Sequence, residues 1–194
     1  MDSQLKMRTA TMNKIHGEEV LGIPSSFVFR SLQRSKKYLD KELQDIEQKL
    51  LSLVKKDQQE QLTLLQSIPG IGMKTALFLI IVTDGFKKFE TASQLCSYVG
   101  ITPTIRESGS SVRGRARINK VGNRKLRNLL FLCSMSTYKQ NKSCRDIFER
   151  ITNKGKSKKL ALIALSNKLL KQCFDISKSG ILYDASYVSV LKVG

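Results

Sequence analysis

A proline and two glycines separate two apolar helical segments of this chain, and this pattern limits the possible folds more than any other feature of the sequence. Residues 58–68 carry apolar side chains at helical spacing. Pro69 ends that segment because its ring cannot continue a helix, and Gly70 and Gly72 allow a turn that other residues enter only with strain. Residues 75–82 are apolar in their middle and must be buried. We therefore predict two helices joined by a tight glycine turn.

An earlier stretch, residues 29–57, repeats apolar side chains every seven residues, with further apolar positions four residues on. That spacing predicts a long helix with one apolar stripe. The stripe either forms a coiled coil with another chain or packs on the core of its own domain. Its members are Leu32, Leu39, Leu43, Ile46, Leu50 and Leu53.

Most of the remaining chain also has helical periodicity, which makes the predicted fold class mainly α. Further helices are expected over residues 92–99, 123–140, 143–151 and 160–174, and Asn123 is the expected N-cap of the second of these. Residues 104–122 are rich in glycine and charge, so we predict an exposed loop or a short ribbon there. Residues 1–28 have only weak periodicity.

The charge of the chain is strongly positive and unevenly distributed. It carries 34 Lys and Arg against 16 Asp and Glu, a formal net charge of +18, and residues 91–194 hold most of the excess. A one-sided positive field attracts a polyanion, so nucleic acid is the natural partner. A charge excess that serves only solubility has the same composition, and composition does not separate DNA from RNA.

Cysteine usage and hydropathy indicate an intracellular, cytoplasmic protein. The chain has no C-x-x-C pair, and most of its cysteines have apolar neighbours, so we expect buried free thiols and no metal site. The longest apolar run, residues 76–82, is too short to cross a membrane, and no signal peptide opens the chain. The cysteines are Cys96, Cys133, Cys144 and Cys173.

The predicted glycine turn is suited to binding a phosphate. Gly70 and Gly72 leave backbone N–H groups directed outward at a helix N-terminus, where the helix dipole adds partial positive charge. Lys74 adds a full charge and Thr75 a hydroxyl donor. Such contacts position a protein on a duplex without reading its sequence. The alternative is an ordinary corner between helices with no ligand.

Later in the chain, residues 106–127 form a basic stretch dominated by arginine, with Glu107 as its one acidic residue. The planar guanidinium of arginine matches phosphate better than a lysine ammonium does, which favours DNA binding over a merely solvated loop. Residues 104–127 contain no aromatic side chain, which counts against a protein that recognises RNA by base stacking. The candidate DNA-binding residues of this stretch are Arg106, Arg113, Arg115, Arg117, Lys120, Arg124 and Arg127.

Ser108 is the candidate catalytic residue. Its hydroxyl lies on a glycine-flanked loop beside dense positive charge, which would stabilise an alkoxide and a transferring phosphoryl group. The one histidine of the chain, His16, is distant in sequence, so a Ser-His-Asp triad is not expected. A Ser-Gly loop is more commonly just a turn.

Several motifs occurring in order resemble those of the C-terminal transposase domain of IS116/IS110/IS902-type insertion-sequence transposases. They are Leu65-x-x-Ile-Pro-Gly-Ile-Gly-x-x-Thr-Ala76, Leu95-x-x-Tyr-x-Gly-Ile-Thr-Pro103, Ser108-Gly109, Ile118-x-Lys-x-Gly-Asn123 and Leu126-Arg127. The resemblance implies a helix–hairpin–helix motif and a serine, here Ser108, that links covalently to DNA during transposition. It also implies an N-terminal RuvC-like domain with Mg²⁺-binding carboxylates, which we do not expect in this chain, and a guide (bridge) RNA.

We therefore expect a transposase fragment that binds DNA and needs a RuvC-like partner chain, which alone would hold Mg²⁺. The alternative is a non-catalytic helix–hairpin–helix DNA-binding remnant or regulator. A homo-oligomer through residues 29–57 is a further expectation, and no membrane partner is expected. The predicted domains are an N-terminal remnant or linker (1–28), a coiled-coil-like helix (29–57), a DNA-binding and serine domain (58–176) and a C-terminal tail (177–194).

Overall fold

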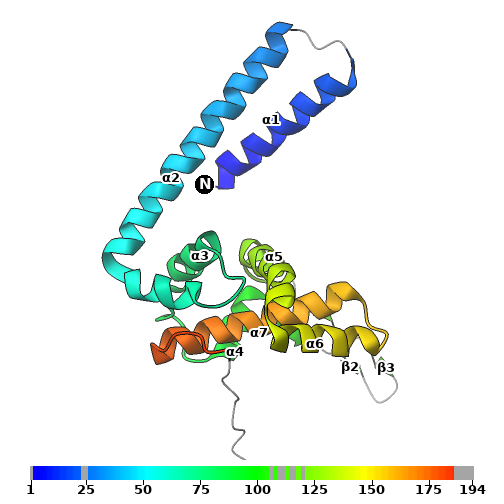
Figure 1. Cartoon of the computed structure of the whole chain (residues 1–194). Helices are drawn as coiled ribbons and strands as arrows, with labels where there is room; N and C mark the ends of the chain where they lie inside the picture. The colour runs from blue at the N-terminus through cyan, green and yellow to red at the C-terminus, as the bar shows by residue number, and fades with distance from the viewer. Residues whose placement is uncertain are drawn as a thin grey trace, which may run out of the picture. The chain divides into compact units, whose positions relative to one another are not determined.

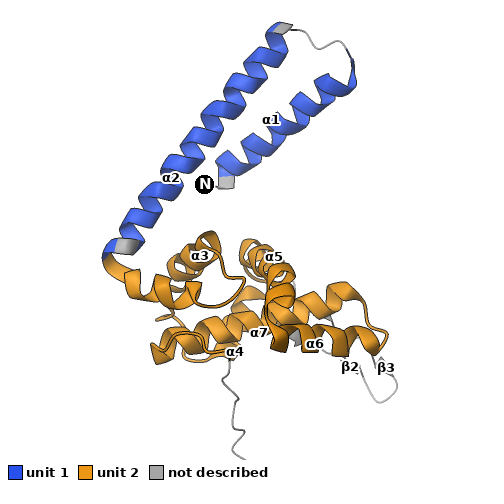
Figure 2. Ribbon diagram, viewed as in Figure 1, with its two compact units in different colours: residues 1–56 blue, residues 57–194 orange. Residues whose placement is uncertain are grey.

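A computed structural model describes residues 2–22, 26–104, 107–108, 112–113, 117–118 and 121–185 of the chain. These residues are mainly helical, as the sequence predicts (Figure 1). They form two compact units, residues 1–56 and residues 57–194 (Figure 2). No helix in the described part of the chain is long and apolar enough to cross a membrane.

The first unit holds α1 (Asp2–Val20) and most of α2 (Ser26–Gln66). α1 folds back along α2 (Figure 1), and Arg8 Nε of α1 is paired with Asp40 Oδ1 of α2. A helix thus forms over most of residues 1–28 although their apolar periodicity is weak.

The long helix predicted over residues 29–57 is present as part of α2. At Gln58, where the sequence predicts the start of a second helix, the backbone leaves helical geometry (φ −142°, ψ 34°). The apolar stripe departs from strict heptad spacing, because Leu53 is 53% exposed whereas its neighbour Val54 is buried. A straight α-helix has 3.6 residues per turn, so a seven-residue repeat drifts around it by about 20° per heptad. By the end of the stripe this drift has turned Leu53 away from the buried face, and Val54 takes the buried position.

The second unit is built around α7 (Lys158–Ser179), which packs on α4 (Ala92–Val99), α5 (Arg124–Gln140) and α6 (Lys142–Asn153) (Figure 1). α3 (Met73–Thr83) packs on α5. Fully buried leucines, including Leu126 and Leu130 of α5 and Leu165 and Leu169 of α7, form much of the core.

Side-chain caps set the starts of α4, α5, α6 and α7, and the sequence predicts the cap of α5. Asn123 Oδ1 accepts a hydrogen bond from Leu126 N at the start of α5, as expected. Asn141 and Ser157 cap α6 and α7 in the same way, and Thr91 forms a capping box at α4. These caps satisfy N–H groups that a helix leaves without partners.

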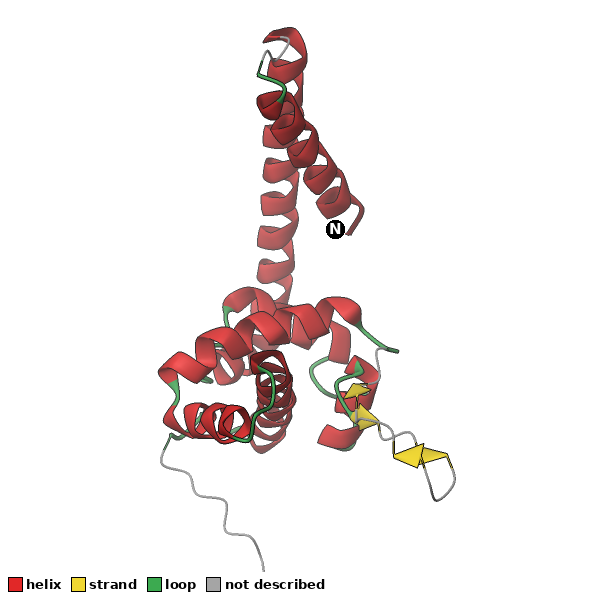
Figure 3. Ribbon diagram, turned by 90° about the vertical axis from the view of Figure 1, so that its right-hand side faces the viewer, coloured by secondary structure: helices red, strands yellow, loops and turns green. Residues whose placement is uncertain are grey.

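Between α4 and α5 the chain forms a ribbon of short antiparallel strands (Figure 3). β1 (Pro103–Thr104) pairs with β4 (Arg117–Ile118), and β2 (Glu107–Ser108) pairs with β3 (Val112–Arg113). The expected short ribbon is therefore present.

Candidate nucleic-acid interface

The glycine turn between α2 and α3 is packed tightly on α5. Gly70 has φ +92°, and a Cβ there would lie 2.0 Å from Thr137 Oγ1 of α5. The Thr137 hydroxyl also lies within hydrogen-bonding distance of two carbonyl oxygens, Pro69 O at 3.0 Å and Cys133 O at 2.9 Å. The turn thus needs glycine for both its backbone conformation and its close approach to α5.

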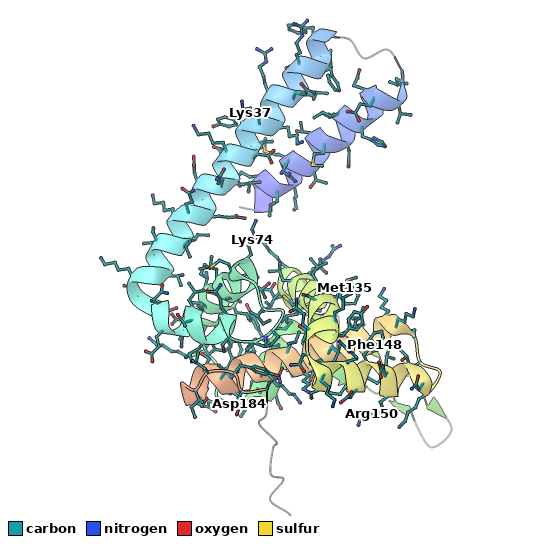
Figure 4. The ribbon with its side chains drawn as sticks, viewed as in Figure 1. Lys37, Lys74, Met135, Phe148, Arg150 and Asp184 are labelled. Carbon is teal, nitrogen blue, oxygen red and sulfur yellow. The ribbon has the colours of Figure 1, made fainter. Side chains whose placement is uncertain are left out.

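The N-terminus of α3 is exposed beside this turn. Gly72 is its N-cap, is exposed and supplies no capping side chain. The first N–H groups of an α-helix have no intrahelical partner, and they carry the positive end of the helix dipole. Lys74, in the first turn of α3, is also exposed and projects outward from the helix (Figure 4). The position has the chemistry of an anion site.

Thr75, predicted to offer its hydroxyl to a phosphate, is buried instead. Its Oγ1 lies 3.2 Å from Cys133 Sγ of α5, and its backbone N–H donates to Gly72 O. The side chain therefore joins α3 to α5, and its assignment as a phosphate donor was wrong. The reason is helical geometry, since Thr75 lies on the face of α3 that packs on α5.

The two arginines of α5 have different environments. Arg124, the first residue of the helix, is exposed. Arg127 is half-buried, and its guanidinium Nη1 donates to Val99 O at the end of α4 with a distance of 2.7 Å. Positive charge near the last carbonyls of a helix is favourable. Arg127 therefore holds α4 against α5, whereas Arg124 remains accessible to a ligand.

The backbone of Ser108 lies at the outer strand pair of the ribbon, where it is the partner of Val112. Arg113 is the partner of Glu107 in the same pair, and Arg117 belongs to the inner pair. Part of the predicted site falls outside the described residues, namely Arg106, Arg115 and Lys120 and the side chains of Ser108, Arg113 and Arg117.

The base of the ribbon depends on a glycine that sequence reasoning did not single out for this role. Gly122 has φ +136°, and a Cβ there would lie 2.4 Å from Tyr98 O of α4. The next residue, Asn123, donates its backbone N–H to that same oxygen at 3.2 Å. The chain therefore leaves the ribbon pressed against the end of α4. A glycine directly before a helix N-cap was the available signal.

The glycine turn and the ribbon base lie toward opposite ends of α5. The turn contacts Thr137, whereas the ribbon ends at Asn123, so at 1.5 Å per residue they are about 20 Å apart along the helix. Between them Lys125 Nζ lies 5.0 Å from the centre of the Phe78 ring of α3. The predicted contacts are thus spread along α5 rather than gathered at one point.

The buried thiols do not offer a competing nucleophile. All four cysteines are free and buried, as predicted. Burial raises the pKa of the Cys96, Cys144 and Cys173 thiols, which keeps them protonated at neutral pH. Within the described ranges, no group of three or more His, Cys, Asp or Glu side chains is arranged to hold a metal ion.

Comparison with known proteins identifies the part of the chain that holds the turn, the ribbon and α5. Residues 62–149 match the model of the family described as Transposase IS116/IS110/IS902 family. This segment is therefore similar to a domain of that transposase family. The match begins within α2 and ends within α6, so it leaves out the first unit and α7.

Individual curated relatives match between 62% and 84% of this chain. The insertion element IS110 43.6 kDa protein of Streptomyces coelicolor is 31% identical over 62% of this chain and 30% of its own length. The pilin gene-inverting protein of Moraxella lacunata is 32% identical over 63% of this chain and 38% of its own. The transposase of element IS1111A of Coxiella burnetii is 28% identical over 84% and 49%. The chain thus spans about a third of the length of the first two relatives.

Proposed function

We propose that the transposase domain binds the sugar–phosphate backbone of duplex DNA through the exposed N-terminus of α3. The observation that carries this proposal is that the N-cap of α3, Gly72, is exposed, lacks a capping side chain and lies beside Lys74. The Thr137 hydroxyl of α5 supports the same turn by donating to Pro69 O. Backbone amides at such a position favour a phosphate and tolerate any base sequence. This geometry supports a helix–hairpin–helix role for α2, the turn and α3. Arg124 and the ribbon cations, toward the other end of α5, provide further phosphate contacts.

We further propose that the domain serves DNA strand cleavage and rejoining during transposition, with Ser108 as nucleophile. Ser108 Oγ would attack a backbone phosphorus, forming a serine phosphodiester while the bond to one sugar oxygen breaks. The serine proton passes to solvent, and the departing oxygen takes one up. Rejoining reverses these transfers, so no oxidant or reductant is needed. The support is the family match over residues 62–149 and the location of Ser108 on a ribbon with Arg113.

Three partners belong to this proposal. A RuvC-like partner chain would supply the Mg²⁺ site, since such a site is what the family resemblance implies for the other half of the enzyme. A guide RNA is the second partner. The third is another copy of this chain, joined through the apolar stripe of residues 29–57.

The binding proposal is tested by changing the cap of α3. The φ of Gly72 is −82°, and a Cβ there meets no atom within 4 Å, so other residues fit. Gly72→Asp adds a good N-cap, so the melting temperature should rise, while its negative charge repels a phosphate. We expect duplex affinity, measured by fluorescence anisotropy, to fall by roughly tenfold or more, in line with the loss of a charge-assisted contact.

Gly72→Asn is the matched control, because it caps the helix without adding charge. It should raise the melting temperature similarly and weaken binding less than Gly72→Asp does. Equal affinity of Gly72→Asp and the unmodified protein would contradict the proposed grip, and so would an unmodified protein that binds no duplex DNA.

The catalytic proposal is tested by trapping a covalent adduct. With element-end DNA and a RuvC-like partner chain present, Ser108→Ala should abolish a denaturation-resistant protein–DNA adduct and leave duplex affinity unchanged. Ser111→Ala, three residues further along the sequence, is the control and should keep the adduct. A protein that binds DNA but never forms an adduct under these conditions would instead be the non-catalytic binder.

A further inference from the structure

A second basic surface lies at the connection between α6 and α7, outside the segment that matches the transposase family. We call it the basic corner and define it by five exposed cations within ten residues. The same ten residues contain no Asp or Glu, and Glu149 directly precedes them. Figure 4 shows Arg150 projecting from α6 near this connection. The members are Arg150, Lys154, Lys156, Lys158 and Lys159.

Hydrogen bonds at the end of α6 and at the start of α7 define the backbone of the corner, so these charges are presented together. Gly155 adopts φ +71° and donates its N–H to Thr152 O at 2.9 Å, which closes the end of α6. Ser157 then caps α7 by accepting from Leu160 N. The two ion pairs identified among the described residues, Arg8–Asp40 and His16–Glu19, lie in the first unit. No identified carboxylate therefore neutralises the corner.

Two of the cations occupy positions that are unfavourable for the helix itself. Lys158 and Lys159 are the first residues of α7, and its first turn holds no acidic residue. The N-terminus of a helix is the positive end of its dipole, where Asp and Glu stabilise and cations do not. The placement of lysines there thus works against the stability of α7, which favours a role in binding a polyanion.

The basic corner is separate from the glycine turn. Just beyond the C-terminal end of α7, Tyr183 N donates to Ser67 Oγ, two residues before the turn. The corner lies at the opposite end of this 22-residue helix, which is about 33 Å long at 1.5 Å per residue. Contacts at the two places should therefore contribute independently.

We infer that the basic corner is a second binding surface for the phosphodiester backbone of a nucleic acid. This inference rests on the proposed function only for the choice of duplex DNA as the first ligand to test. Cations that contact phosphates release counterions, so each lost contact lowers the salt dependence of binding by about 0.9 on a log–log scale for duplex DNA.

The test uses the double variant Lys158→Gln/Lys159→Gln in the full chain. Glutamine has a helix propensity similar to that of lysine, so α7 should be kept. We expect affinity for duplex DNA to fall about tenfold at low salt, and the log–log salt slope to decrease by about 2. The melting temperature should rise, because two cations leave the positive end of the dipole.

The matched control is Lys171→Gln/Lys178→Gln, which removes two exposed lysines from the C-terminal half of the same helix. Lys178 lies in the last turn, where a cation is favourable, and its Nζ is 5.5 Å from the centre of the Phe174 ring. This control should therefore lower the melting temperature slightly and leave the salt slope unchanged.

Parallel titrations with single-stranded RNA identify the source of the phosphodiester. A corner variant with unchanged affinity and salt slope for both nucleic acids overturns the inference, even if Gly72→Asp confirms the proposed grip. Weaker binding together with a lower melting temperature also overturns it, because the lysines would then serve α7. If the unmodified protein binds RNA but no duplex, and the corner variant weakens that binding, the inference stands and the proposed DNA grip fails.

Discussion

The glycine turn and the base of the ribbon, toward the two ends of α5, both depend on a glycine where the backbone meets another helix, but they are held differently. At the turn, the side chain of Thr137 contacts the backbone at Pro69. At the ribbon base, the contact is between backbone groups, Asn123 N and Tyr98 O. A side chain can shift its position more readily than a hydrogen-bonded backbone can. The ribbon base should therefore tolerate less change than the turn.

The largest effect is expected for Gly122→Ala at the ribbon base. Its φ of +136° is nearly exclusive to glycine, and the added Cβ would lie 2.4 Å from Tyr98 O. We expect the free energy of unfolding, measured by urea denaturation, to fall by about 3–4 kcal/mol. Gly17→Ala in α1 is the control: its Cβ meets no atom within 4 Å, and it should stabilise by up to about 1 kcal/mol. Equal effects would refute this role of Gly122.

A smaller effect is expected for Gly70→Ala at the turn, about 2–3 kcal/mol, because part of the clash is with a side chain. In a Thr137→Ala background the Oγ1 at 2.0 Å is absent, so the added cost of Gly70→Ala should drop by about 1 kcal/mol. A double-mutant cycle measured by denaturation gives this coupling. Strict additivity would show that Thr137 does not brace the turn.

The two arginines of α5 are expected to affect different properties, Arg127 the stability of the fold and Arg124 the binding of DNA. Arg127→Gln removes the guanidinium that donates to Val99 O, so unfolding should become easier by about 1.5 kcal/mol. Arg124→Gln should leave stability within about 0.5 kcal/mol, because that side chain is exposed. Arg124→Gln should instead lower the log–log salt slope of DNA binding by about 0.9. The reverse pattern would exchange the roles assigned to these two residues.

Among the substitutions expected to destabilise the fold, the smallest effect is expected at the N-cap of α5. Asn123→Ala removes the side-chain acceptor of Leu126 N while keeping the backbone bond to Tyr98 O, so it should cost about 1 kcal/mol. Asn123→Asp keeps an acceptor and should be close to neutral or stabilising. Thermal denaturation of both variants checks this. A cost as large as that of Gly122→Ala would mean that the cap, rather than the close backbone approach, holds the ribbon base.

Local sequence was sufficient where a contact is made within a few residues. The glycine turn and the N-cap Asn123 are both as expected from residue type and spacing. The phosphate-binding chemistry of the α3 N-terminus could also be proposed from Gly72 alone. Turns and caps depend on the conformational limits of single residues, so they can be recognised without the fold.

Tertiary packing decided the roles of residues whose partners lie far along the chain. Thr75 and Arg127 belong to motifs typical of phosphate binding, yet one packs on Cys133 and the other holds Val99. Their partners lie on other helices, so spacing along the chain could not predict them.

The amino-acid sequence alone determined that this chain is mainly helical, strongly basic and built around a glycine turn, because helix periodicity, charge and backbone freedom are properties of neighbouring residues. Only the tertiary structure decided which cations and hydroxyls remain available to a ligand, because burial depends on which helix faces meet. The spread of the turn and the ribbon base along α5, and the location of the basic corner at the far end of α7, follow from that packing.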